Sequence, residues 1–209
     1  MALLFAKNNS LSAVTALPAS ISGGGLNLIS TQTASSSATI DFTSGIDSTY
    51  KEYIFKFINI HPSADAVAFL FNMSIDSGSN YNVTKTTTIF EARHTEDGGT
   101  SGLAYSGRTL SEDLAQSTSF QRLANNVSSD SDHGVCGYIH LFDPSNTTFI
   151  KNYIGLISIV NNGNGAYQYY NAGYGNTTSA VDAIQFKMDS GNIDSGTIKM
   201  YGVTWWLLV

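Results

Sequence analysis

The stretch Tyr53-Ile54-Phe55-Lys56-Phe57-Ile58-Asn59-Ile60 decides the fold class of this chain. Successive side chains of a β-strand point to opposite faces, and here apolar residues occupy both alternating sets. The surrounding segment, Tyr50 to His61, is therefore predicted to be a central strand of a sheet. A second apolar run, Ala66 to Met73, follows and ends at the turn residues 76–80, as strands in a core do.

Strand-like and turn-like segments continue to alternate through the rest of the chain. Residues 38–42 alternate apolar and polar side chains, which is typical of a half-buried strand. Further strands are predicted at residues 84–92, 134–142, 147–160, 166–172, 180–188 and 197–208. Residues 110–126 are predicted to form one short helix or a surface loop. The sequence thus predicts an all-β fold, an antiparallel β-sandwich of the jelly-roll type.

The composition excludes several classes of protein. The chain has 209 residues, 42% hydrophobic and 12% charged, which fits neither a disordered chain nor a coiled coil. The net charge of −6 argues against nucleic acid and against anionic membranes as partners, because both require a basic surface. The single cysteine, Cys136, excludes a disulfide scaffold, and its apolar neighbours predict that it is buried. We also expect no secretory signal, no membrane insertion and a reducing compartment.

The first 37 residues differ from the rest. They contain one charged residue, Lys7, and short apolar pieces separated by glycine and serine. One interpretation is an N-terminal anchoring arm over residues 1–37, followed by a β-sandwich domain over residues 38–209. The other is an N-terminal strand or loop of the same domain. The candidate interface residues of such an arm are Leu3, Leu4, Phe5, Leu26 and Leu28.

No catalytic or metal-binding motif is recognisable in the sequence. A glycoside hydrolase needs two carboxylates at a set separation, and pairs could form among Glu91, Glu96, Asp97, Glu112 and Asp113. Asp130 and Asp132 resemble the start of a calcium loop, but the later glutamate of such a loop is missing. We therefore predict no catalytic residues, no metal and no cofactor, and a protein that is not an enzyme.

Aromatic residues are the remaining candidates for binding. Ring faces pack against the apolar face of a sugar, and four tyrosines lie in a segment rich in glycine and asparagine. The candidate glycan contacts are Tyr167, Tyr169, Tyr170 and Tyr174, whose alternative role is to fill the core. Trp205 and Trp206 point to opposite faces of the last predicted strand, so at least one of them is expected to be buried or in a subunit contact, and both are candidate interface residues.

Several strings of this sequence resemble a family of structural proteins from the virions of tailed phages that infect marine and cyanobacterial hosts. The resemblance covers roughly residues 33 to 203. It consists of an opening strand followed by Ser48-Thr49-Tyr50 and a long hydrophobic strand, and of a closing strand that begins Gly196-Thr197-Ile198. The segments that carry it are residues 33–42, 46–50, 141–145, 176–184 and 190–203.

The resemblance implies a β-sandwich displayed on a virion, as a capsid decoration (cement) protein or as part of a tail fibre. Its motifs contain no catalytic signature, so no site residues transfer. It implies assembly in the host bacterial cytoplasm, with the major capsid protein or other virion proteins as partners. We expect a homo-oligomer, a trimer, anchored by residues 1–37. The alternatives are a fibre or receptor-binding module that recognises host surface glycans and, last, a polysaccharide depolymerase.

Overall fold

The computed structural model describes residues 25–105 and 112–204, and these ranges contain twelve strands and no helix. The strands are β1 (Gly25–Thr33), β2 (Ile40–Phe42), β3 (Glu52–Pro62), β4 (Val67–Ser74), β5 (Lys85–Thr95), β6 (Ser101–Tyr105), β7 (Gln121–Val127), β8 (Val135–Phe142), β9 (Lys151–Val160), β10 (Gly165–Gly175), β11 (Ala183–Met188) and β12 (Ile193–Thr204). Accordingly, no helix in these ranges is long and apolar enough to cross a membrane.

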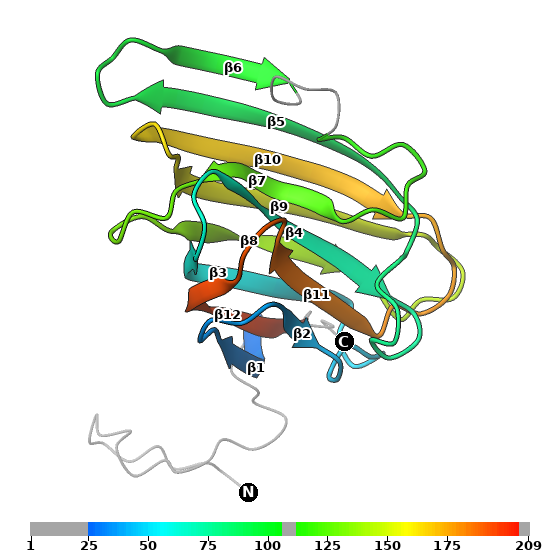
Figure 1. The fold of residues 1–209 in the computed structure, drawn as a ribbon. Coiled ribbons are helices and arrows are strands. Elements are labelled where there is room, and N and C mark those ends of the chain that lie inside the picture. The colour runs from blue at the N-terminus through cyan, green and yellow to red at the C-terminus, as the bar shows by residue number, and fades with distance from the viewer. Residues whose placement is uncertain (1–24, 106–111, 205–209) are drawn as a thin grey trace, which may run out of the picture.

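The strands form two antiparallel sheets that pack face to face as a sandwich (Figure 1). The larger sheet has eight strands in the order β1-β12-β3-β8-β9-β10-β5-β6, and the smaller has four in the order β2-β11-β4-β7. The predicted all-β sandwich is therefore confirmed. The stretch from Tyr53 to Ile60 lies in β3. This strand is inside the large sheet between β12 and β8, which agrees with the predicted central strand.

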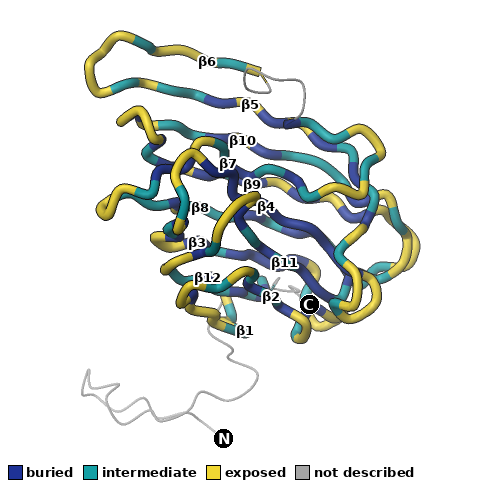
Figure 2. The backbone as a smooth tube through the Cα atoms, viewed as in Figure 1, coloured by how far each residue is buried: buried dark blue, intermediate teal, exposed yellow. Residues whose placement is uncertain are grey.

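The core fills the space between the two sheets, and Figure 2 shows the buried residues of both sheets in dark blue. Phenylalanines from both sheets meet edge to face at its centre, with Phe57 and Phe186 at 5.1 Å between ring centroids. Such pairs add about 1 kcal/mol each to the burial of the rings. The cluster consists of Phe42, Phe55, Phe57, Phe69, Phe71 and Phe186, all at most 2% exposed.

Of the two alternatives for residues 110–126, the helix is wrong for the part that the structure describes, and the loop applies to residues 112–120. Residues 121–127 are strand β7, and residues 112–120 form a loop that crosses β5. The backbone groups of this loop bond to β5 and leave none for helical turns. Lys85 and Ser117 exchange two backbone hydrogen bonds, and the Thr87 amide donates to the carbonyl of Leu114 at 2.9 Å. Pairing with the neighbouring strand thus outweighs the weak helical spacing.

Residues 25–37 belong to the sandwich and are not part of a separate arm. Strand β1 pairs with β12 along its whole length, with Leu26 opposite Val203 and Leu28 opposite Tyr201. Ala34 is buried and Ser37 bridges Ile193. Of the two interpretations of this segment, the N-terminal strand applies here. The rest of the proposed arm, residues 1–24, lies outside the described residues.

Candidate functional site

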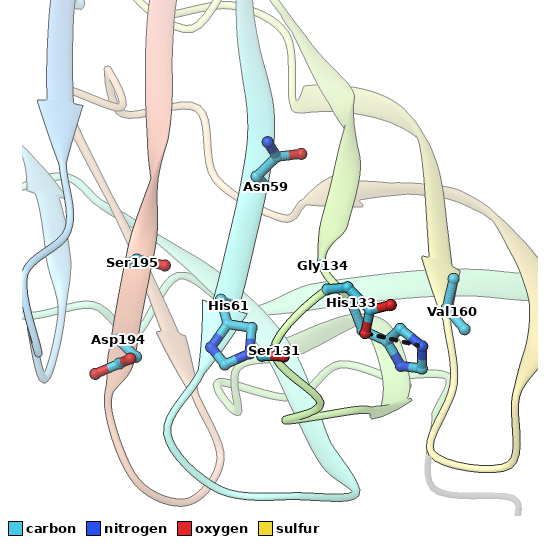
Figure 3. A pocket seen from close by; sticks show the side chains of 9 residues that line it. Asn59, His61, Ser131, His133, Gly134, Val160, Asp194 and Ser195 are labelled. Carbon is cyan, nitrogen blue, oxygen red and sulfur yellow. Dashed lines mark ion pairs between the residues drawn. The ribbon is translucent and has the colours of Figure 1, made fainter.

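A hollow at one end of the sandwich has a volume of about 610 Å³ (Figure 3). It forms where β3 and β9 end, where β12 begins and where the loop before β8 crosses between them. Its lining residues are Asn59, His61, Ser131, Asp132, His133, Gly134, Val160, Asp194 and Ser195. Strand β12 can approach β3 here because Gly196 has no side chain: a Cβ atom would lie 2.4 Å from the carbonyl oxygen of Asn59.

The two imidazoles of this hollow are held by the loop and do not form a catalytic pair. His61 Nε2 lies 3.1 Å from the carbonyl oxygen of Asp130, and His133 lies 3.8 Å from the carboxylates of both Asp130 and Asp132. No hydrogen bond joins either ring to a serine hydroxyl in the described residues. The hollow can therefore offer hydrogen bonds to a polar ligand, but it holds no activated nucleophile.

The loop that resembles a calcium site does not gather its carboxylates. Asp130 and Asp132 are 66% and 86% exposed, and the His133 amide donates to the Asp130 carbonyl at 2.9 Å to close a turn. Within residues 25–105 and 112–204, no group of three or more His, Cys, Asp or Glu side chains is placed to hold a metal ion. The alternation of oxygen donors in the sequence reflects a turn whose carboxylates point to solvent.

The four candidate tyrosines lie on β10, but they divide between its two faces. Tyr167 and Tyr169 point into the sandwich, and Tyr169 is 1% exposed with its hydroxyl donating to the carbonyl of Asn125 at 3.1 Å. Burial raises the pKa of Tyr169 above its ordinary value. The prediction that Tyr169 contacts a glycan is therefore wrong, because strand alternation turns it into the core.

Tyr170 and Tyr174 point outward from the large sheet. Tyr170 stacks on Phe90 of β5, with the ring centroids 4.5 Å apart and the planes 5° apart. Beside them lies a shallow hollow of about 410 Å³. It is lined by residues 86–88 of β5, 152–154 of β9 and 172–174 of β10. Threonine, asparagine and tyrosine side chains at this hollow could bond and stack a sugar.

The outward face of the large sheet carries many exposed apolar side chains, and nothing in the described structure covers it. We call it the outer face; it comprises the outward side chains of all eight strands. Antiparallel sheets of this kind ordinarily present polar residues to water. Here Leu28, Ile58, Leu103, Tyr105 and Ile154 are between 42% and 77% exposed. An exposed apolar surface of this extent marks a binding surface.

Charges are rare on the outer face. Among the described residues, Glu52 is the one carboxylate at an outward register position, and it is bonded to His140. The cations are Lys56, which lies over the ring of Tyr201 at 5.4 Å, and its neighbour Lys199. Depletion of charge together with enrichment in aromatic residues is typical of the centre of protein interfaces.

The carboxylates that could have formed a hydrolase pair have structural roles. Asp97 accepts from Thr95 and Gly99 in the β5–β6 turn, and Asp113 accepts from the Ile89 amide at 2.8 Å. Glu91 bonds Arg93 and Glu112 bonds Asn125 inside the sandwich, where they are 5% and 2% exposed. Burial and the nearby Glu91 raise the pKa of Glu112, although the Asn125 bond opposes this. This buried pair lines none of the hollows described above.

The structure also places the other predicted contact residues. Leu26 and Leu28 lie exposed on the outer face at its β1 edge. Cys136 is exposed on the same face, so its predicted burial is wrong: the apolar run around it is a strand with two different faces. The remaining interface candidates lie outside the described residues: Leu3, Leu4, Phe5, Trp205 and Trp206. The outer face itself was signalled in the sequence by β3, whose outward positions include Ile54 and Ile58.

Comparison with known proteins gives no relative. No family model, no curated protein and no solved structure matches this chain. The resemblance to phage virion proteins therefore stays a prediction, and the surfaces of the sandwich carry the argument about function.

Proposed function

We propose that this chain is a non-enzymatic structural protein of a phage particle, a decoration or cement protein on the outside of the capsid. The observation that carries the proposal is the apolar, charge-poor outer face of the eight-stranded sheet. A protein that exposes such a face needs a partner to cover it, because each square ångström of apolar surface removed from water contributes about 25 cal/mol. An assembled particle supplies such partners in many copies.

The interior supports a role in contact rather than in catalysis. Its buried carboxylates Glu91 and Glu112 are held by protein partners: Glu91 pairs with Arg93, and Glu112 accepts a hydrogen bond from Asn125. The hollow at the end of the sandwich presents imidazoles and carboxylates whose contacts shape a turn. Partners can therefore contact this protein mainly through its surface, and the outer face is the most extensive apolar part of the described surface.

The proposal is tested on purified virions of the phage that encodes the chain. Quantitative mass spectrometry should find hundreds of copies per particle, as expected for decoration. Particles stripped of the protein should rebind the wild type, and Ile154→Lys should reduce the occupancy because it puts a charge on the outer face. Ile75→Lys is the matched control, since Ile75 is equally exposed (42%, against 47% for Ile154) and lies after β4 of the other sheet.

Absence of the chain from the particle would refute the proposal. A copy number of a few to a few dozen would place the chain in the tail or a fibre and refute the decoration role. Equal occupancy for both variants would show that the outer face contributes to attachment neither directly nor through contacts between copies of the chain.

A receptor-binding module is the second candidate, favoured by the hollow beside Tyr174. Asn152 and Thr86 supply polar groups there, and the Phe90–Tyr170 stack supplies an aromatic surface next to it. A glycan array with the wild type and Tyr174→Ala tests this candidate. Binding that is lost in Tyr174→Ala and kept in Tyr167→Ala, whose ring faces inward, supports it. Absence of binding to host glycans contradicts it.

A further inference from the structure

Resting on the proposed function, we propose that the partner of the outer face is the outer face of a second copy of this chain. The two sheets would pack face to face about a two-fold axis that runs parallel to the strands, between β8 and β9. This arrangement buries the apolar face of each copy against the other and leaves the smaller sheets outside. It makes the assembling unit a dimer.

Apolar side chains cross the outer face in continuous rows, as a sheet-on-sheet contact requires. The strand registers place seven outward residues in one row, from β6 to β12: Tyr105, Phe90, Tyr170, Leu156, Tyr138, Lys56 and Lys199. The next row contains Ala172, Ile154, His140, Ile54, Tyr201 and Leu28. Aromatic and aliphatic residues thus fill the first row from β6 to β8 and, apart from His140, the second row from β10 to β1.

The size of the face matches what a stable dimer needs. Neighbouring strands are about 4.8 Å apart, so eight strands span about 34 Å, and an eight-residue strand is about 27 Å long. The face therefore measures roughly 900 Å² in plane. Standard interfaces bury about 800 Å² on each partner, so one copy of this face against another is sufficient.

The distribution of charge selects both the partner and the axis. Lys56 and Lys199 lie toward one edge of the face, and the opposite half, with Phe90 and Tyr170, has no charged residue in the row. An axis parallel to the strands reverses the strand order of the second copy. Lys56 then lies over the partner's Tyr170, and Lys199 over the partner's Phe90. Cations over aromatic rings are favourable, whereas an axis across the strands would bring like charges together.

A single flat face of this kind fits two-fold symmetry. In a two-fold contact both copies use the same patch, whereas a ring of three requires two different, complementary patches. The described residues carry one extended apolar face. The inference therefore replaces the trimer expected from the sequence with a dimer.

The experiment measures the mass of the full-length protein in solution across a range of concentrations, by light scattering and sedimentation. The wild type should have the mass of two chains of 22.4 kDa. Ile154→Lys should be monomeric and Ile75→Lys dimeric, with circular dichroism confirming that both are folded. Cys136, which is exposed on this face, should react with a bulky maleimide more slowly in the wild type than in Ile154→Lys. A monomer or trimer at all concentrations overturns the inference.

The sign of an introduced charge tests the axis. Tyr170→Lys would oppose the partner's Lys56, whereas Tyr170→Glu would attract it, so the dimer of the lysine variant should dissociate at least about tenfold more readily. Adding Lys56→Glu to Tyr170→Lys should restore the dimer. Equal effects of both signs, or no restoration, overturn the axis parallel to the strands.

Particle occupancy separates this inference from the proposed function. A monomeric wild type that still decorates particles refutes the dimer and leaves the decoration role standing. A dimer that is absent from particles refutes the decoration role and leaves the self-association standing.

Discussion

The buried lysine of β5 allows a quantitative test of how this interior is built. Lys85 is 0% exposed, and its Nζ donates to Asn72 Oδ1 and, at 2.8 Å, to the carbonyl oxygen of Val83. No described carboxylate lies within ion-pair distance of it. Burial without a counter-charge lowers the pKa of Lys85 from 10.5 to about 7, because the charged form loses its hydration. The test compares the free energy of unfolding at pH 7 and at pH 9, in the wild type and in Lys85→Met.

The lowered pKa fixes the sign of the effect. Between about pH 7 and 10.5 the unfolded chain holds a proton on Lys85 that the folded chain has released, so the free energy of unfolding rises with pH. The pKa difference corresponds to about 5 kcal/mol in total, of which about 2 kcal/mol is recovered between pH 7 and 9. Lys85→Met removes this dependence. At pH 7 the substitution also removes the destabilisation of about 4 kcal/mol that comes from burying the lysine charge. It leaves the Val83 carbonyl unpaired, which costs about 2 kcal/mol of stability.

We therefore expect Lys85→Met to be about 2 kcal/mol more stable than the wild type at pH 7 and no more stable at pH 9.5. Urea unfolding followed by tyrosine fluorescence and circular dichroism at each pH measures both values. Lys51→Met, at a side chain that is 64% exposed, is the control and should keep the wild-type pH dependence. Parallel pH curves for the wild type and Lys85→Met would refute the reasoning, because they would mean that Lys85 is charged in the folded protein.

Three further predictions concern the interior, the backbone and the N-terminal segment. Glu112→Gln should raise the urea midpoint at pH 7 more than at pH 4. The pKa of Glu112 is raised in the folded protein, so the wild type loses stability as the pH rises through that pKa, and the glutamine variant does not. A larger gain at pH 4 would contradict this. Gly196→Ala should cost about 1–3 kcal/mol, since φ is +115° and the Cβ atom would meet Asn59. Gly25→Ala, at a φ of +102° with nothing within 4 Å of the added Cβ atom, reports the cost of the positive φ alone, and equal losses would refute the steric argument. Deleting residues 1–24 should lower particle occupancy if they anchor the protein, and full occupancy would refute anchoring; a deletion of residues 1–37 would also remove strand β1 and cannot separate the two effects.

The sequence predicted those features that depend on the alternation of side chains along a single strand. It predicted most strands to within a few residues, because apolar period and turn residues are read from neighbours along the chain. It misjudged residues 121–127, which form strand β7, because they pair with β4, a strand that lies far away along the sequence. It also misjudged Tyr169 and Cys136, because which face of a strand is covered depends on the opposite sheet.

By itself, the sequence determined that this protein is an all-β sandwich of low charge, and that β3 is apolar on both sides. Composition and period suffice for this, because strand formation and the burial of one face follow from local pattern. Only the tertiary structure decided that the second apolar side of β3 continues across the sheet as the outer face. Register brings Tyr170, Leu156, Tyr138 and Lys56 into one row, although they come from four separate segments of the chain. A surface is made by neighbours in space, and hydrogen-bonded pairing between distant strands sets which residues become neighbours.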